Sequence, residues 1–371
     1  MIVQDVINIL DEMAPLNYAE DFDNVGLLVG QKNQKITNIL VTLDTLETVI
    51  DEAIEKKCNL IVSFHPIIFK GLKKINGSNY VERVVIKAIQ NNIAIFAIHT
   101  ALDNHWQGVN HVICEKLTLK NQQILIPKKE TICKLNTFVP NKDLETVRDS
   151  LFKAGAGTVG NYTACSFYSN GTGSFKGNEN STPIIGDKNE FREEQESQLQ
   201  VTFTTHLRSN VLKALRNSHP YEEIAYEITT LENTNQKIGM GMIGELETPL
   251  TELECLQLIK KTFKAEGIRH SSFINKPIKK IAVLGGSGAF AIEDAKRAGA
   301  DLFITADIKY HEFYQAENKF VIADIGHYES EQYTKDLIVS YLRKKISNFA
   351  PAFNSGNIVL SDKNTNPIKY F

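Results

Sequence analysis

The sequence predicts an α/β fold with two similar α/β lobes, whose mainly parallel sheets are flanked by helices, and an inserted ferredoxin-like α+β domain. Three observations support this. Short apolar runs alternate with helical patterns in the first third of the chain, and a series of three apolar runs returns after residue 279. The segment that lies between these two regions has a different order of elements. Alternation of strands and helices is typical of βαβ units. We therefore expect domains at residues 1–125, 126–233 and 234–371.

The predicted strands of the first lobe end in polar side chains. After an N-terminal amphipathic helix, strands are expected at Ile39–Asp44, Asn59–His65 and Ile93–His99, with helices near 47–57 and 80–91 between them. Ligands of open parallel sheets bind beyond the carboxyl ends of the strands. Asp44, His65 and His99 lie at those ends, and Asp103 follows His99 by four residues. Each could be an ordinary loop residue, but their gathering at one edge favours a binding site.

The middle of the chain shows a different order of elements. The pattern is βαββαβ, which is typical of a ferredoxin-like module. Its predicted elements are 134–140, 143–154, 163–169, 200–206, 210–217 and 224–232. Residues 171–198 are rich in Gly, Asn, Ser and Glu, and we expect them to form a mobile loop.

The second lobe contains the stretch around which the chain is organised. Strands are expected to end near Gly285, Asp307 and Gly326, with a helix near 291–297. Directly after Gly326, His327 and Glu331 stand four residues apart where a long helix is predicted to begin. Residues at that spacing share one helical face, so an imidazole and a carboxylate can bind one cation. Alternatively, His327 caps the strand end, and the glutamates favour the helix N-terminus electrostatically.

A rival motif precedes this stretch. Residues 286–291, GSGAFA, match the G-x-G-x-x-A turn of dinucleotide-binding folds, and Asp307 lies about twenty residues further on. A tight turn from strand to helix explains the same glycines and is the favoured interpretation.

Composition restricts the class of protein. The 371 residues are 42% hydrophobic and 23% charged, as in a globular chain of two or three domains. With 41 Lys and Arg against 44 Asp and Glu, the net charge is -3, so nothing indicates a nucleic-acid partner. Five scattered cysteines without a C-x-x-C pair, and an N-terminus unlike a signal peptide, predict a cytoplasmic protein. No apolar run is long enough to predict a membrane span.

Eight segments together resemble the motifs of the Nif-three-like family, whose members are often labelled GTP cyclohydrolase 1 type 2 homologues. They occur in the family's order at Asp21–Gly30, Thr42–Val49, Ser63–Ile75, His99–Asn104, Gly239–Leu246, Ala282–Gly288, Thr305–Phe313 and Asp324–Glu331. The resemblance covers both lobes. The inserted domain looks like the module, similar to the CutA and PII signalling proteins, that longer bacterial members carry.

The resemblance implies two divalent metal ions in a cavity between the lobes. The family pattern maps onto His65, Asp103, His327 and Glu331, with the two carboxylates as the expected bridging ligands. Family members commonly have two adjacent histidines at the second strand end, whereas this chain has Phe64 before His65. One cation should therefore lack an imidazole ligand. Zinc, iron and manganese all suit such donors.

Two functions remain open at this point. A pair of metal ions favours hydrolysis of a nucleotide-like or phosphate-bearing small molecule, and the family label implies opening of the guanine imidazole ring with loss of formate. His99 and either Tyr310 or His311 are candidates for proton transfer or substrate orientation. The alternative is a non-catalytic protein that binds a metal or an effector. The resemblance also implies a closed homo-oligomer, expected to be a hexameric ring. No membrane partner is expected.

Overall fold

The computed structural model describes residues 1–349, 353 and 355–371. The chain divides into two compact units, one made of Met1–Pro127 and Gln236–Phe371 and the other of Lys128–Asn235. In the described part of the chain, no helix combines the length and the apolar character that a membrane crossing needs. The sequence predicts the insertion at 126–233, close to the bounds of the second unit.

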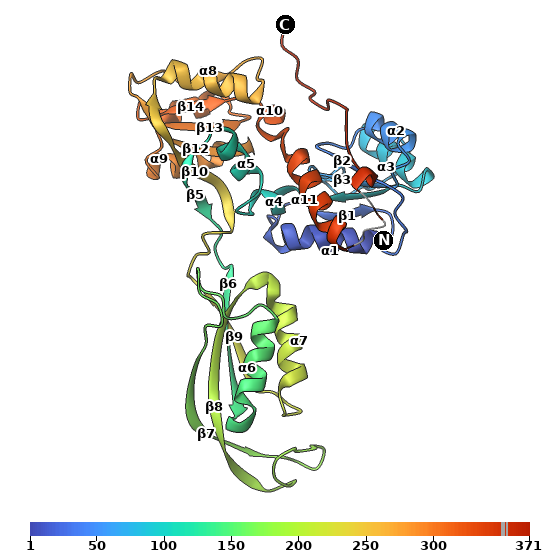
Figure 1. Ribbon diagram of the computed structural model, residues 1–371, viewed down its shortest axis with the longest axis vertical. Coiled ribbons are helices and arrows are strands. Elements are labelled where there is room, and N and C mark those ends of the chain that lie inside the picture. Colours follow the sequence, from blue (N-terminus) through green and yellow to red (C-terminus); the bar gives the residue numbers. More distant parts are fainter. Residues whose placement is uncertain (350–352, 354) are drawn as a thin grey trace. The chain divides into compact units, whose positions relative to one another are not determined.

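The first sheet of the larger unit is mainly parallel and buried on both faces. Its strand order is β1-β4-β3-β2-β15, and only β1 runs antiparallel to its neighbour; Figure 1 labels β1, β2 and β3 of this sheet. Its strands are β1 (Gly26–Val29), β2 (Ile39–Thr42), β3 (Leu60–Ser63), β4 (Ala94–Ala97) and β15 (Ile358–Leu360).

Helices cover each face of this sheet because most side chains of its strands are apolar. Leu40 packs in one cluster with α2 (Glu47–Glu55) and α3 (Tyr80–Gln90). Its neighbours Ile39 and Val41 pack in another cluster with α1 (Val3–Met13) and α11 (Thr334–Phe349). Successive side chains of a strand point to opposite faces, so a run without alternation fits a strand buried on both sides.

The second sheet of the same unit is mixed, so the prediction of mainly parallel sheets is wrong for this lobe. Its order is β11-β14-β13-β12-β10-β5, and only the β12–β13 and β13–β14 pairs are parallel. The chain leaves the unit along β5 and returns along β10, so these paired strands must run in opposite directions. The strands are β5 (Lys120–Pro127), β10 (Gly239–Leu250), β11 (Arg269–His270), β12 (Ile278–Ser287), β13 (Leu302–Ala306) and β14 (Val321–Asp324).

The two sheets share one hydrophobic core. A single cluster of buried side chains joins β2, β3 and β4 to β12, β13 and β14. The cluster also takes in α5 (Val109–Lys116) and α8 (Glu252–Phe263), whereas α9 (Ile292–Arg297) packs on the opposite face of the second sheet. The sheets also exchange edge strands, because β5 completes the second sheet and β15 completes the first. Neither lobe is therefore built from one continuous half of the chain.

The smaller unit has one antiparallel sheet in the order β7-β8-β6-β9. Helices α6 and α7 pack on one face of the sheet around buried side chains such as Leu135 and Leu199. The elements are β6 (Ile132–Pro140), α6 (Leu144–Lys153), β7 (Phe167–Lys176), β8 (Phe191–Thr204), α7 (Arg208–Ser218) and β9 (Tyr226–Leu231).

Half of the mobile loop predicted at 171–198 belongs to the two strands of a β-hairpin, and residues 177–190 form the connection between them. Strands β7 and β8 pair without a break from Phe167 opposite Gln200 to Lys176 opposite Phe191. The segment is polar because β7 is an edge strand that is mostly exposed, and cross-strand backbone hydrogen bonds do not require apolar side chains.

The long helix predicted after Gly326 is divided into α10 (His327–Glu331) and α11. The residues between the two helices are anchored to the end of α8. Gln332 donates its side-chain amide to the carbonyl of Phe263 (2.8 Å), and the Tyr333 hydroxyl donates to the carbonyl of Thr262 (2.8 Å). These tertiary contacts separate the short helix that carries His327 and Glu331 from the longer one.

Candidate metal site

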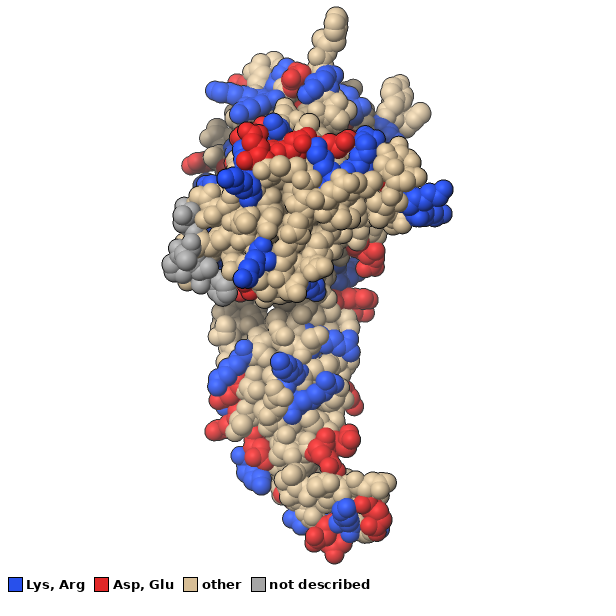
Figure 2. Space-filling model, turned by 90° about the vertical axis from the view of Figure 1, so that its right-hand side faces the viewer, with Lys and Arg blue, Asp and Glu red and all other residues tan. Residues whose placement is uncertain are grey.

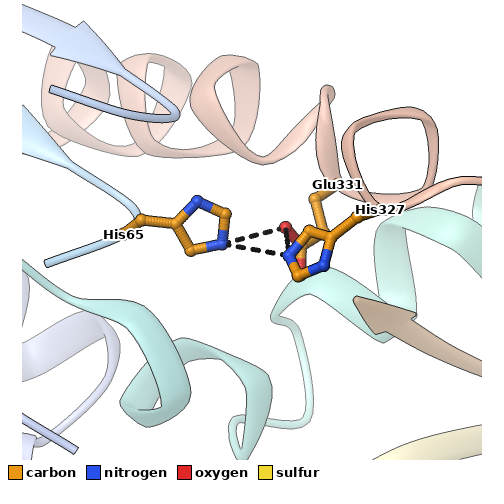
Figure 3. A group of neighbouring side chains, drawn as sticks. All are labelled: His65, His327 and Glu331. Carbon is orange, nitrogen blue, oxygen red and sulfur yellow. Dashed lines mark hydrogen bonds and ion pairs between the residues drawn. The ribbon is translucent and has the colours of Figure 1, made fainter. Parts of the chain in front are cut away.

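Three ligand atoms converge between the two sheets of the larger unit. His65 follows β3, whereas His327 begins α10 and Glu331 ends it. Glu331 Oε2 lies 3.1 Å from Nε2 of each histidine, and the two Nε2 atoms are 3.4 Å apart (Figure 3). The prediction that the spacing of His327 and Glu331 brings them onto one side of a helix is therefore confirmed.

The other nitrogen of each imidazole faces a carboxylate. His65 Nδ1 lies 2.8 Å from Asp44 Oδ1, and His327 Nδ1 lies 2.7 Å from Asp307 Oδ2. An ionised carboxylate can only accept a hydrogen bond, so Nδ1 carries the proton, and Nε2 of the neutral ring presents a lone pair. Pairs of this kind commonly orient metal-binding histidines.

The electrostatics of the group favour positive charge at its centre. Burial lowers the pKa of His65, but the charge of Glu331 and the hydrogen bond with Asp44 raise it to about 10. The pKa of His327 is raised to about 11 by Glu331 and Asp307 against the same effect of burial. Burial alone would raise the pKa of Glu331, yet the two imidazoles hold it far below its usual range. The negative charge that retains these protons would equally stabilise a metal cation.

The geometry of these donors fits a cation. A metal bound tetrahedrally at about 2.0–2.1 Å keeps its ligand atoms about 3.3 Å apart, close to the three separations found here. Among the described residues, the polar atoms that face the buried Glu331 Oε2 are the two imidazole Nε2 atoms at 3.1 Å. A buried acceptor of this kind needs a positively charged or hydrogen-donating partner. The three residues therefore form a candidate metal site.

Close packing requires two glycines of the rival dinucleotide motif, and one of them, Gly286, borders this site. A Cβ on Gly286 would lie 2.3 Å from Glu331 Oε1, and its φ of +69° is one that side chains with a Cβ rarely adopt. A Cβ on Gly288 would lie 2.1 Å from Thr305 Oγ1. Close packing therefore accounts for both glycines, and Asp307 serves as the partner of His327.

Asp103 lies near the group but outside it. It ends the short helix α4 (His99–Asp103), and its Oδ1 is buried without a hydrogen-bond partner among the described residues. Burial, followed by the negative charge of Glu331, raises the pKa of Asp103 well above its ordinary value. The three atoms within mutual ligand distance belong to His65, His327 and Glu331. The structure thus brings Asp103 into the electrostatic environment of the group, without placing it among these atoms.

Beside the group lies a third imidazole. The ring of His99 is 5.2 Å from that of His65, and its Nδ1 lies 2.8 Å from Asp23 Oδ1. Phe64 is fully buried, with its ring 4.9 Å from His65 and 5.5 Å from His99. Tyr310 and His311 are both exposed, and the Tyr310 hydroxyl lies 3.1 Å from that of Tyr314.

Sequence reasoning missed the carboxylates that hold the imidazoles. In the sequence, Asp44 and Asp307 stand out only as residues at strand ends, and Asp23 only as part of the family motif Asp21–Gly30. The C-terminal segment adds a further contact, since the Thr365 hydroxyl donates to Asp44. Asn366 donates to Glu329 Oε1 (2.9 Å) in the helix that carries the ligands. These contacts join distant segments, so no spacing along the chain predicts them.

Comparison with known proteins places this chain in a family. The model of the Duf34/NIF3 (NGG1p interacting factor 3) family matches residues 1–367. The chain belongs to the Duf34/NIF3 family. The resemblance of the sequence to the Nif-three-like family is thereby confirmed.

Members of the Duf34/NIF3 family resemble the chain over its whole length. A protein of Bacillus subtilis (strain 168) named GTP cyclohydrolase 1 type 2 homolog is 37% identical over 370 residues, which cover 99% of this chain and 98% of that protein. A protein of the same name from Listeria monocytogenes is 34% identical, with 98% and 97% of the two chains covered. The crystal structure of a Bacillus cereus protein related to NIF3 superposes with a TM-score of 0.84 at 32% identity, covering 100% and 99% of the chains.

Proposed function

We propose that the protein is a metal-dependent hydrolase that binds two divalent cations and acts on a nucleotide-like or phosphate-bearing small molecule. The observation that carries the proposal is the convergence of His65, His327 and Glu331, with both imidazoles held by further carboxylates. When bound, a divalent cation would polarise a substrate oxygen and lower the pKa of water, which favours hydrolysis near neutral pH. The donors suit zinc, iron or manganese.

Asp103 is the fourth ligand in this proposal. Its buried, unpartnered Oδ1 and the raised pKa of its carboxyl group fit a side chain that needs a cation beside it. Asp103 and Glu331 would be shared by the two cations. The second cation would have fewer imidazole ligands, because the apolar ring of Phe64 occupies the position before His65.

His99 is the residue proposed to move a proton. Because Asp23 holds its Nδ1, its Nε2 is left to take a proton from an attacking water or to give one to a leaving group. The backbone φ of His99 is +27°, which persists only where the surroundings hold it. Asp23 supplies that support, since it also accepts hydrogen bonds from the backbone N–H and the hydroxyl group of Thr100.

Two exposed aromatic rings, Phe69 beside His99 and Phe22 beside Phe69, support the proposal of a planar substrate. Phe69 lies edge-on to His99 with ring centroids 6.4 Å apart, and Phe22 lies 6.4 Å from Phe69. The side chains of Phe22 and Phe69 are 67% and 46% exposed. Large apolar side chains exposed next to a polar site favour stacking on a flat ligand such as a nucleobase.

Three lysines support an anionic substrate. Lys70, Lys73 and Lys74 follow Phe69 on the loop after His65 and line a surface cavity of about 460 Å³. Within the described part of the chain, none of the three forms an ion pair with a carboxylate, so their charges are available to phosphate groups. The names of the relatives make GTP the first nucleotide to test, with ring opening and loss of formate as the reaction.

The mixed charge of the molecule agrees with a small-molecule ligand rather than a nucleic acid. On the face shown in Figure 2, Lys and Arg side chains are interspersed with Asp and Glu. The net charge of -3 agrees with that mixture. We further propose that the protein is cytoplasmic and forms a homohexamer.

We also propose that the inserted unit is ferredoxin-like. Its element order, β6-α6-β7-β8-α7-β9, and its sheet order, β7-β8-β6-β9, support this assignment. A non-catalytic regulatory protein is the second candidate function. The observation that favours it is a large cavity within the inserted unit.

Turnover of GTP and other nucleotides by the metal-loaded protein distinguishes the two functions. A hydrolase should release product only with metal present, and Asp103→Ala should reduce kcat by at least about a hundredfold while the fold is kept. Glu55→Ala, on the exposed surface of α2, is the control and should leave kcat unchanged. A ligand that stabilises the protein without any turnover would favour the regulatory function.

A further inference from the structure

The inserted unit contains a cavity of about 860 Å³ at the closed end of the β7–β8 hairpin. Its walls come from β7, from the loop that follows it, and from residues 221–225. All of these residues lie within the Lys128–Asn235 unit, and none belongs to the metal cluster. The volume is in the range of pockets that enclose small molecules.

The sheet face that the helices leave uncovered forms the floor of the cavity. Phe138 lies opposite Gln198, and Gln198 lies opposite Ser169 on β7. Residues directly opposite one another in a sheet point to the same face. Leu199, the neighbour of Gln198, packs in the core beneath α6 and α7, so this row faces the other way.

Glu196 is the polar centre of the floor. Its side chain is largely buried, and its Oε1 accepts a hydrogen bond from the Tyr221 hydroxyl at 2.7 Å. Burial and the contact with Glu196 raise the pKa of Tyr221, so the phenol remains a donor at neutral pH. A Cβ on Gly173 would lie 2.1 Å from Glu196 Oε2, so the absence of a side chain at Gly173 makes room for the carboxylate.

The rest of the lining combines apolar and acidic groups. The loop after β7 is tied down where Thr182 N–H donates to Glu222 Oε1 at 2.7 Å, and this loop adds Ile184 and Ile185 to the wall. The rings of Phe175 and Tyr221 lie 5.9 Å apart. The carboxylates of the lining are Glu196, Glu222 and Glu223, and its basic side chain is Lys176.

We propose that this cavity binds small organic cations, with a protonated amine beside Glu196 and an apolar, preferably aromatic body against Phe138, Phe175 and the loop. A carboxylate accepts hydrogen bonds but donates none, so it selects for donors such as ammonium groups. Aromatic rings add attraction for a cation, and the apolar wall excludes water from the ligand body. This site is independent of whether the metal cluster is catalytic.

Three indole compounds of similar shape test the charge requirement on the full-length protein. Tryptamine is a cation, tryptophol is neutral and indole-3-propionate is an anion. Isothermal titration calorimetry should show tryptamine binding at least about tenfold more tightly than either of the others. Equal affinity for tryptophol, or no detectable binding of tryptamine at millimolar concentrations, would overturn the proposal, and this comparison needs no variant.

Variants then locate the site. Glu196→Gln removes the negative charge. Gly173→Ala retains the charge but moves the Glu196 carboxylate from its position. Each variant should therefore weaken tryptamine binding by about tenfold or more. Glu193→Gln, on an exposed residue of the same strand that does not line the cavity, is the matched control and should bind like the unmodified protein. If Glu196→Gln, folded by circular dichroism, binds tryptamine as tightly as the control, the site is wrongly placed.

Discussion

The imidazoles of His65 and His327 face each other through Nε2 atoms 3.4 Å apart, although 262 residues separate them in the chain. Two lone-pair donors this close repel each other unless a proton or a metal lies between them. Glu331 completes the arrangement, because it lies one turn after His327 on the same helix. Folding of both sheets into one core is therefore a condition for forming the site.

The carboxylates that hold the imidazoles should control metal affinity. Asp44→Asn keeps the shape of the side chain but removes the charge that orients His65 and stabilises its Nδ1 proton. We expect metal affinity to fall by about 10- to 100-fold with the fold unchanged. Titration calorimetry with zinc measures this, and Asp51→Asn, an exposed residue paired with Lys87, is the control. Equal affinities for the two variants would contradict the role of Asp44.

Metal binding should release protons. In the metal-free protein the pKa values of His65 and His327 are raised to about 10 and about 11, so both rings are protonated at pH 7.5. A cation at Nε2 must displace those protons, so affinity should rise with pH, and about two protons should be released for the first cation. Calorimetry in buffers of different ionisation enthalpy gives the number. A binding enthalpy that does not depend on the buffer would show that the prediction is wrong.

Glu52 should stabilise the protein only above acidic pH. It is buried on α2, and it accepts hydrogen bonds from Lys56, from Ser361 and from the backbone of Asp362. Burial raises its pKa, but these contacts lower it below the ordinary value of 4.5. A lowered pKa adds stability that is complete above the unfolded value and is lost as pH falls through the folded one.

Replacing Glu52 tests this pH dependence. Glu52→Gln should reduce the free energy of unfolding at pH 7 by about 1–3 kcal/mol, and the difference should shrink as the pH falls below about 4.5. Urea unfolding at pH 7 and again below about pH 4.5 measures the free energy of unfolding of the variant and of the unmodified protein. Glu55→Gln, at an exposed position of the same helix, is the control. A difference that stays constant with pH would rule out a charged Glu52 as its source.

Phe64→His should strengthen the weaker of the two proposed cation sites. The new imidazole would stand beside His65 and His99, where the Phe64 ring now lies. We expect the second cation to bind about tenfold or more tightly, because a ligand is added next to existing ones. Phe64→Leu, which adds no donor, is the control in the same titration. If both variants bind the second cation alike, the missing imidazole does not limit its binding.

Local signals in the sequence predict the candidate ligands but not the carboxylates that hold their imidazoles. His65 was found because a strand ends there, and His327 with Glu331 because their spacing fits a helix. Asp23 meets His99 across 76 residues, and Thr365 meets Asp44 across 321, so only the folded chain brings them together. The exchange of β5 and β15 between the sheets is likewise not predictable from the sequence, because a short apolar run does not indicate which sheet it joins.

The metal content of the purified protein tests the central claim most directly. His327→Ala combined with Glu331→Ala removes two of the three converging ligands, and inductively coupled plasma mass spectrometry compares it with the unmodified chain. The unmodified protein should carry about one to two divalent cations per chain, and the double variant should carry none while remaining folded by circular dichroism. A folded double variant that retains the same metal content would contradict the assignment of this site.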